Sequence, residues 1–539
     1  MAFLLLWFGT LDYRDLIKTD EGRYAEIARE MVVSGDWITP RQTDIKYFYK
    51  PPLQYWATAL AFQSFGINEW TARLWPALTG FVALLFAMLT LGRIFDRRTA
   101  WLGAAVGASS MLYFGAAHFN TLDMGLTCFM FVSLCAFMLA HFQPNNSEPT
   151  RRRWMLLCWA ALALAVLSKG LVGIVLPGAV LLLFMLIERD FSVLRRLEWL
   201  RGLSLFFLIT APWFVVVSIQ NPEFPRYFFF HEHFERFLTT VHRRYQPWWY
   251  FLPVLCYGLL PWLGWLPQAL WQALRVQHEP PFNQVQRKTL RLVLIWCVLI
   301  FVFFSVSKSK LPSYILPIFP ALALLIAVVL RNTSYKVWQW QSFGLVATGL
   351  LVLIPVWNMM NYADNAVELA LYGKYRQVLL VAVAVWVLGC CCAFIAARWH
   401  RADWAAGVLT ATALSSFTLG MLGHQQMSVL YSARELSTTL KPLLGAASKV
   451  YSVGFYDHTL PYYLGRTVTL VAHQDEMSFG LQQEPQRWIP TLEAFHEQWL
   501  KEVQPYAVLP PDALPRLQAL NLPLREVYRD PRRVVISRP

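Results

Sequence analysis

Residues 378–397 read V-L-L-V-A-V-A-V-W-V-L-G-C-C-C-A-F-I-A-A, without a single charged side chain. As a helix, such a run crosses the hydrocarbon core of a bilayer, which is about 30 Å thick and takes about 20 residues. Comparable runs recur along most of the 539 residues, of which 56% are hydrophobic and only 15% charged, and the mean hydropathy is +0.39. This composition excludes a soluble domain of this length and predicts a polytopic α-helical membrane protein.

The apolar runs predict about thirteen membrane-spanning helices, with boundaries good to ~2–4 residues. We place them at 1–13, 72–92, 100–118, 123–142, 154–168, 171–187, 203–219, 249–271, 292–307, 311–330, 341–358, 378–397 and 403–423. The first run is short and lacks a basic flank, and no small-residue cleavage site follows it. We therefore expect that Met1 lies inside the true first helix, rather than at the start of a cleaved signal peptide.

Many basic residues lie in short turns between the predicted spans. With an odd number of spans these turns all lie on one side of the membrane, and an excess of Lys and Arg is typical of cytoplasmic loops. They are Arg93, Arg97, Arg98, Arg151, Arg152, Arg153, Arg189, Arg195, Arg196, Arg201, Arg275, Arg287, Lys288, Arg291, Arg331, Lys336, Arg398 and Arg401. The loop 14–71, the segment 220–247 and the tail after Met427 then lie outside. For a bacterial inner membrane, that side is the periplasm.

The chain changes character near residue 430. Four segments have the alternating or continuous apolar residues typical of strands, at 449–456, 467–471, 506–510 and 533–537. Helical patterns lie near 491–503 and 512–520. We expect a transmembrane catalytic domain at 1–429 and a small periplasmic α/β domain at 430–539. The tail has no glycine-rich phosphate loop and no nucleophile elbow, which favours a cap or recognition module.

The first outer loop combines charged groups that suit a phosphate-bearing substrate. It contains D-E-G-R-Y at 20–24 and K-P-P-L-Q-Y-W at 50–56, where two prolines stiffen the backbone beside Lys50. Helical spacing from Asp20 to Ser34 puts apolar side chains on one face, as in a helix lying in the membrane interface. Asp20 and Glu21 then start that helix, so either helix capping or chemistry accounts for them.

The eight cysteines all lie in apolar runs, where a free thiol behaves as a small hydrophobe, and we assign them no chemistry. The net charge of +14 and the pI near 9.4 are compatible with nucleic-acid binding, but no nucleic-acid module is visible. His231 and His233 flank Glu232, a spacing that is weak for a metal site and more typical of hydrogen-bonded loop histidines.

Four motifs together resemble the GT-C class of membrane glycosyltransferases, and most closely the ArnT family. They are D-E-G-R-Y-A-E-I-A-R-E-M-V-V-S-G-D-W at 20–37, Y-F-Y-K-P-P-L-Q-Y-W at 47–56, T-L-D at 121–123 and H-E-H-F-E-R-F at 231–237. The resemblance extends over the whole chain. It implies transfer of aminoarabinose, or a related amino sugar, from undecaprenyl phosphate to a lipid A phosphate, by a monomer in the inner membrane.

The resemblance also implies roles for particular residues. Asp20 becomes the catalytic carboxylate and Asp123 a second acidic residue, while Lys50, Arg23 and Arg236 become ligands of the donor phosphate. By the same resemblance His231 is a candidate ligand of a divalent metal ion. However, Tyr49 stands where aminoarabinose transferases carry an acidic residue before K-P, which weakens the case for metal and for that sugar.

The outer loops contain more cations than one donor phosphate can bind, and an anionic acceptor lipid would bind the others. They are Lys46, Arg41, Arg243, Arg244, Lys308 and Lys310. Ordinary solvated charge, or lysine snorkelling at helix ends, is the alternative. If the acceptor is a phosphate it is already nucleophilic and Asp20 orients it; a hydroxyl acceptor needs Asp20 as base. Transfer in one displacement inverts the anomeric centre.

Two other functions remain open from the sequence. A protein O-mannosyltransferase would share the architecture but select an extended Ser/Thr peptide, which the basic outer loops disfavour. A transporter or flippase of lipid-linked sugars would carry charges buried at mid-membrane or broken helices in repeated halves. An oligosaccharyltransferase is disfavoured because W-W-Y-F at 248–251 is not the W-W-D-Y-G signature of that group.

Overall fold

The structure is a computed structural model and describes residues 2–143, 146–235, 245–275 and 282–539. The chain forms two compact units. Unit 1 comprises Met1–Phe8, Trp75–Asn358 and Gln377–Met421, and unit 2 comprises Gly9–Leu74, Met359–Arg376 and Leu422–Pro539. The first outer loop thus shares a compact unit with the tail, and these units cut across the predicted domains 1–429 and 430–539.

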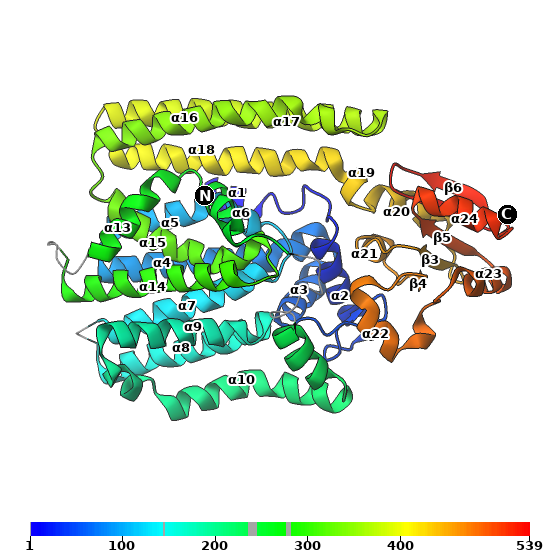
Figure 1. Cartoon of the computed structure of the whole chain (residues 1–539), viewed down its shortest axis with the longest axis horizontal. Coiled ribbons are helices and arrows are strands. Elements are labelled where there is room, and N and C mark those ends of the chain that lie inside the picture. Colours follow the sequence, from blue (N-terminus) through cyan, green and yellow to red (C-terminus); the bar gives the residue numbers. More distant parts are fainter. Residues whose placement is uncertain (1, 144–145, 236–244, 276–281) are drawn as a thin grey trace. The chain divides into compact units, whose positions relative to one another are not determined.

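Unit 1 is built from helices (Figure 1). In chain order the described elements that build it are α1 (Ala2–Phe8), α4 (Glu69–Ile94), α5 (Arg97–Ser109), α6 (Met111–Ala117), α7 (Asp123–His141), α8 (Glu148–Lys169), α9 (Val172–Glu188), η1 (Phe191–Arg196), α10 (Trp199–Gln220), η2 (Arg226–Glu235), η3 (Trp248–Tyr250), α12 (Phe251–Gly258), η4 (Leu263–Trp265), α13 (Leu266–Arg275), α14 (Gln284–Val306), η5 (Pro312–Ile318), α15 (Phe319–Leu330), α16 (Tyr335–Asn358), α17 (Ala366–Arg398) and α18 (Ala402–Gly423).

The predicted run 1–13 is helical only at Ala2–Phe8, and the run 311–330 corresponds to η5 with α15. The other predicted runs lie, within a residue or two, on one of these helices or on a bent helix pair. Among the described residues, eight helices are long and apolar enough to cross a membrane, or up to ten if the pairs α5–α6 and α12–α13, bent by 70° and 115°, each count as one span. The expected number of about thirteen is higher because α1 is short, α8 begins with several charges and α9 has only 17 residues. A polytopic helical membrane protein is confirmed.

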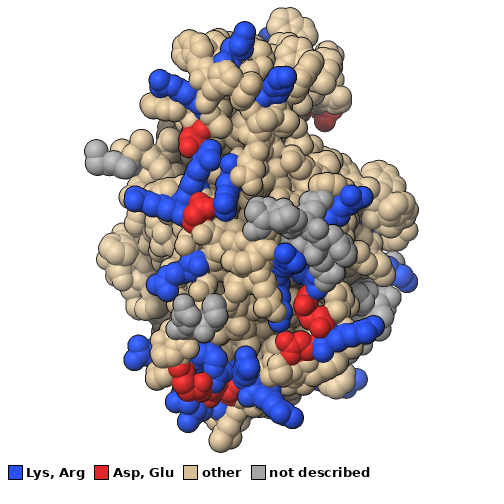
Figure 2. Space-filling model, turned by 90° about the vertical axis from the view of Figure 1, so that its left-hand side faces the viewer, with Lys and Arg blue, Asp and Glu red and all other residues tan. Residues whose placement is uncertain are grey.

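Figure 2 views one end of the molecule and shows many Lys and Arg side chains there, with fewer Asp and Glu. Exposed arginines come from turns of unit 1 that are far apart in the sequence, including Arg97, Arg153, Arg196 and Arg398. The excess of basic residues in these turns is the pattern that the positive-inside rule describes. We call this end of unit 1 the basic end.

The tail forms a five-stranded sheet with the order β4-β3-β5-β7-β6. Its strands are β3 (Lys449–Val453), β4 (Thr469–Val471), β5 (Pro505–Leu509), β6 (Arg525–Arg529) and β7 (Val534–Ser537). Strand β3 is parallel to β4 and β5, whereas β7 is antiparallel to β5 and β6. The four predicted strands are present, as are the predicted helices, now α23 (Leu492–Lys501) and α24 (Leu514–Ala519). Strand β6 was not predicted, because it is an edge strand with little buried surface.

Helix α2 (Asp20–Ser34) starts at the D-E-G-R-Y motif, as predicted, but it is buried from Glu21 to Met31, polar residues included. It packs against α3 (Leu53–Phe65) and α21 (Leu460–Leu464). A Cβ on Gly22 would lie 2.6 Å from the carbonyl oxygen of His458, so only glycine permits this approach. The helix therefore lies inside unit 2, and it does not expose a polar face as expected for an interfacial helix.

A tight hairpin follows α2 and precedes the K-P-P motif. Strands β1 (Arg41–Gln42) and β2 (Ile45–Lys46) are joined by Thr43 and Asp44, whose φ angles are +50° and +67°. The Glu30 carboxylate accepts hydrogen bonds from the backbone N–H groups of Thr43 and Asp44, the latter at 2.8 Å. Since a left-handed turn is unfavourable for Thr and Asp, this buried carboxylate stabilises it.

The tail holds the same hairpin from the other side. Thr43 Oγ1 donates to the carbonyl oxygen of Val468 at 2.7 Å, and Ile45 lies in the hydrophobic core of the tail. Helix α22 (Ser478–Gln483) packs so closely on β2 that a Cβ on Gly480 would lie 2.2 Å from the carbonyl oxygen of Lys46. The backbone leading to Lys50 is thereby held by contacts from both α2 and the tail.

Candidate active site

Arg23 lies at the centre of a buried cluster in unit 2 and is only 4% exposed. Its Nη1 donates to Asp20 Oδ1 at 3.2 Å, and its Nη2 forms an ion pair with Glu476 of η9 (Asp475–Met477). The Asp20 side chain is 44% exposed, which leaves part of its carboxylate accessible. Arg23 therefore fixes Asp20 at the start of α2 and neutralises part of the charge of two carboxylates.

His458 also contacts Arg23, with its Nε2 atom 3.2 Å from Nη2. Burial, followed by the nearby Arg23 charge, lowers the pKa of His458 well below its ordinary value, so the imidazole is neutral. A guanidinium only donates hydrogen bonds, so Nε2 accepts here and the ring proton resides on Nδ1. His458 thus accepts a hydrogen bond from Arg23 without adding a charge to the cluster.

Three tyrosines line the same cluster. The Arg23 guanidinium lies over the Tyr47 ring at 5.7 Å, and the rings of Tyr24 and Tyr55 are 6.0 Å apart. Burial raises the pKa of all three phenols, which therefore remain protonated donors. A protonated phenol can donate to a phosphate or sugar oxygen without adding negative charge.

Two lysines of the first loop lie four residues apart, between the hairpin and the proline pair. Lys46 ends β2, and Lys50 precedes Pro51 at the start of α3; both lysines are half-buried. Tyr49 stacks on Tyr47, with ring centroids 4.7 Å apart. Tyr49 therefore packs against the tyrosine that covers Arg23.

A second carboxylate site lies in unit 1. Asp123 is the first residue of α7 and forms an ion pair with Lys169, the last residue of α8. Lys169 Nζ also lies 4.9 Å from the centre of the Tyr314 ring. Local sequence patterns do not report this pairing, because the two residues are 46 positions apart.

The two predicted acceptor lysines after α14 differ. Lys308 is exposed. Lys310 is 4% exposed, and its ammonium donates to the carbonyl oxygens of Ser307 and of Gln246, the latter at 2.9 Å. Two of the three donors of Lys310 are therefore used inside the protein, which favours a role in fixing the loop over one in binding an acceptor.

Arg236, Arg243 and Arg244 lie outside the described residues. His231 belongs to the π-helical segment η2, and its ring stacks on Tyr227 at 5.1 Å. In the described part of the chain, no three His, Cys, Asp or Glu side chains are grouped so that they could hold a metal ion. The side chains of Glu232 and His233 lie outside the described residues, so a metal at His231 stays a prediction.

Glu21, next to Asp20, has a structural role that the sequence analysis missed. It is 2% exposed and accepts hydrogen bonds from Arg14 at 2.8 Å and from Arg73 at 2.7 Å. Burial raises the pKa of the Glu21 carboxyl, but the two guanidinium groups outweigh burial and hold that pKa well below its ordinary value. This triad anchors the start of α2, and with it Asp20.

Two family models match the chain. The one described as Aminoarabinose transferase C-terminal domain matches residues 436–538, and the one described as Dolichyl-phosphate-mannose-protein mannosyltransferase matches residues 1–228. The first match covers the sheet of the tail. The second covers the loop that contains Asp20 and Lys50, together with the helices through α10.

Curated relatives match over most of the chain. The undecaprenyl phosphate-alpha-4-amino-4-deoxy-L-arabinose arabinosyl transferase of Shewanella sediminis is 36% identical over 385 residues, or 71% of this chain and 68% of that protein. The enzyme of that name from Pseudomonas paraeruginosa is 31% identical over 512 residues, or 93% and 89%. A crystal structure of ArnT from Cupriavidus metallidurans bound to undecaprenyl phosphate is 38% identical, with a TM-score of 0.93, and covers 99% of this chain and 96% of that chain.

We expect Glu21→Gln to destabilise unit 2, because it leaves two buried guanidinium groups without a full counter-charge. Removing one partner of a buried ion pair costs about 3–5 kcal/mol, and the apparent melting temperature in detergent should fall clearly. The matched control is Glu526→Gln, whose partner Arg529 is half exposed, and it should melt like the wild type.

The Glu21 effect should also depend on pH. Since its pKa is lowered in the folded protein, its contribution is present above the ordinary glutamate pKa and is lost as the pH falls below it. The melting difference between wild type and Glu21→Gln should therefore shrink in acid. A difference that stays constant down to the acid limit of the protein would contradict a charged Glu21.

Proposed function

The chain belongs to the family of undecaprenyl phosphate-alpha-4-amino-4-deoxy-L-arabinose arabinosyl transferases, and on this premise we propose that it transfers aminoarabinose, or a related amino sugar, from undecaprenyl phosphate to a phosphate of lipid A. It is a multi-pass membrane glycosyltransferase that depends on a polyprenyl-phosphate sugar. The observation that carries the proposal is the partly exposed Asp20 carboxylate, fixed by buried Arg23 at the start of α2.

The proposed location is the bacterial inner membrane, with the transfer site on the periplasmic side. The basic end of unit 1 supports this orientation, because basic turns remain in the cytoplasm. One membrane span, α4, separates the loop containing Asp20 from the first basic turn. The loop therefore lies on the side of the membrane opposite to the basic turns.

In the proposed reaction, an oxygen of the acceptor phosphate attacks the anomeric carbon of the sugar. The bond from that carbon to the donor phosphate oxygen breaks, and the released undecaprenyl phosphate keeps the electron pair. One displacement inverts the anomeric centre. Lys50, together with Arg236, stabilises the charge that develops on the leaving phosphate.

Asp20 then orients the acceptor or the amino sugar, since a phosphate nucleophile needs no strong base. Arg23, expected from the sequence as a donor ligand, already contacts two carboxylates and His458. We therefore assign Arg23 the task of holding Asp20, with the Tyr47 and Tyr55 phenols as further donors to oxygen. Asp123, paired with Lys169, is proposed as the second acidic residue of the reaction.

The acceptor phosphate is proposed to bind the remaining outer cations. Lys46 and exposed Lys308 suit this role, and Arg243 and Arg244 belong to the same proposal. Arg41 already pairs with Glu484 at 3.0 Å, so we give it a structural role. A second candidate function, protein O-mannosyl transfer, is favoured by one observation, the match of residues 1–228 to the mannosyltransferase model.

Asp20→Asn should lower transfer about 100-fold, since misplacing a reactant by about 1 Å costs roughly 10²-fold. The fold should persist, because Asp20 is half exposed and Arg23 keeps Glu476. Transfer is measured with purified enzyme in detergent, and the control is Asp12→Asn, an exposed aspartate in the same loop. Wild-type turnover by Asp20→Asn would reduce Asp20 to a first-turn residue of the helix.

Lys50→Ala should weaken binding of undecaprenyl phosphate by about 1.5–3 kcal/mol, or roughly 10- to 150-fold in Kd, if Lys50 makes a charge-assisted hydrogen bond. Arg236→Ala should behave in the same way. Binding of the lipid phosphate is measured directly, so chemistry does not enter the result. Exposed Lys501→Ala is the matched control, and an unchanged Kd for Lys50→Ala would exclude Lys50 from the donor site.

The acceptor is tested by incubating the enzyme and its lipid-linked donor with lipid A, with dephosphorylated lipid A and with a Ser/Thr peptide. We expect product from phosphorylated lipid A alone, because removing the phosphate removes both the nucleophile and its ion pairs. Mass spectrometry of the product identifies the sugar, with a pentosamine expected. Transfer to the peptide but not to phosphorylated lipid A would establish the mannosyltransferase alternative.

A further inference from the structure

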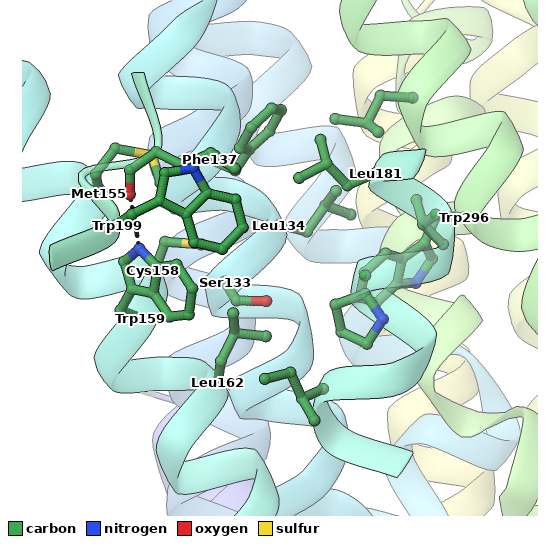
Figure 3. A pocket seen from close by; sticks show the side chains of 16 residues that line it. Ser133, Leu134, Phe137, Met155, Cys158, Trp159, Leu162, Leu181, Trp199 and Trp296 are labelled. Carbon is green, nitrogen blue, oxygen red and sulfur yellow. Dashed lines mark hydrogen bonds between the residues drawn. The ribbon is translucent and has the colours of Figure 1, made fainter. Parts of the chain in front are cut away.

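Unit 1 contains an apolar pocket enclosed by α7, α8, α9, α14 and the start of α10. Its cavity volume is about 210 Å³, below the roughly 300–1,000 Å³ of sites that hold whole small molecules, so it accommodates part of an extended chain. Figure 3 shows Met155, Trp159 and Trp199 on one side of this space and Leu181 and Trp296 on the other. No site residue discussed above lines the pocket.

The polar groups around the pocket are already hydrogen-bonded within the protein. The indole N–H groups of Trp159, Trp199 and Trp296 donate to the carbonyl oxygens of Leu197, Leu194 and Pro317, each at 2.8–2.9 Å. The hydroxyl of Ser133 donates to the carbonyl oxygen of Met130 at 2.7 Å. A ligand in this pocket therefore finds hydrophobic surface and gains nothing from polar groups of its own, as is true of an alkyl chain.

The wall at α9 has room for such a chain. Pro177 and Gly178 both line the pocket, and a Cβ on Gly178 would meet no atom within 4 Å. A side chain could therefore be introduced at this position without a clash.

The pocket lies beside strongly basic segments at the basic end of unit 1. Leu197 and Trp199 line it, and the preceding Arg195 and Arg196 are exposed. Arg151 links the start of α8 to the segment 195–201, because it donates to the carbonyl oxygen of Arg196 at 2.9 Å and forms an ion pair with Glu198 at 3.1 Å. The first turns of α8 and the segment 195–201 contain six arginines (Arg151, Arg152, Arg153, Arg195, Arg196, Arg201) and two glutamates (Glu148, Glu198).

We propose that this pocket holds one acyl chain of an anionic phospholipid from the leaflet at the basic end, with its phosphate at Arg195 and Arg196. A chain gains little hydrophobic free energy on moving from lipid into an apolar pocket, since lipid tails are equally apolar. The head group therefore decides which lipid is kept, and a basic rim selects an anionic one. This site is separate from sugar transfer and is expected whatever the acceptor is.

The test uses the full-length protein in nanodiscs that contain equal amounts of phosphatidylglycerol and phosphatidylcholine with identical acyl chains. Native mass spectrometry should find one phosphatidylglycerol retained, preferred by about tenfold, given the known attraction of paired basic residues for anionic lipid. Arg195→Ala with Arg196→Ala should abolish this preference. The matched control changes Arg398 and Arg401, which are exposed arginines at the same end of unit 1.

Gly178→Leu should fill the pocket and release the retained lipid, while Gly344→Leu should not. Gly344 in α16 also has open space around a built Cβ, so the two variants carry the same change in helices that tolerate leucine. Phosphatidylglycerol with a photoreactive acyl chain should label residues 133–137, 155–162 or 174–181 in wild type and in Gly344→Leu only. Equal retention of both lipids, equal labelling in both glycine variants, or a polyisoprenoid as the retained molecule would overturn the proposal.

Discussion

Burial of charge along α2 is the constraint on which unit 2 depends. Glu21 is held between Arg14 and Arg73, Arg23 between Asp20 and Glu476, and Glu30 caps the hairpin turn. Each of these groups is costly to bury unless its partners are in place. The site geometry therefore exists only when the first loop and the tail fold together, and the tail does more than cover a finished site.

Much of the architecture could be predicted because it rests on local patterns. Apolar runs long enough for a bilayer became helices, and the V-V-I-S and Y-A-V-L runs became strands β7 and β5. The pattern misled at α2, which was predicted to lie in the membrane interface but buries its charged residues, such as Arg23, inside unit 2. Their partners are supplied partly by residues more than 400 positions away, such as Glu476 and His458, and no periodicity reports such contacts.

The candidate site residues likewise divide into those that a local motif indicates and those whose role depends on a distant partner. Asp20 and Lys50 could be found because they stand in short motifs beside a helix start and a proline pair. Lys169 and His458 could not, since each is ordinary in its local sequence and gains a role only through a distant partner. Lys310 shows the reverse, because a lysine that looked available for an acceptor is occupied by backbone carbonyl oxygens.

The cations of this protein thus divide into three groups by what surrounds them. Buried ones such as Arg14, Arg23 and Arg73 are matched by carboxylates and hold the fold, because an unmatched charge there would be too costly. Exposed ones at the basic end follow the membrane orientation and can recruit anionic lipid. Lys46 and Lys50 form the third group, since they are half-buried in the first loop, where the hairpin and the proline pair fix the backbone. Their proposed role is to contact a phosphate that enters and leaves with each turnover, and half-burial suits that role, because a charge-assisted hydrogen bond is stronger where bulk water is partly excluded.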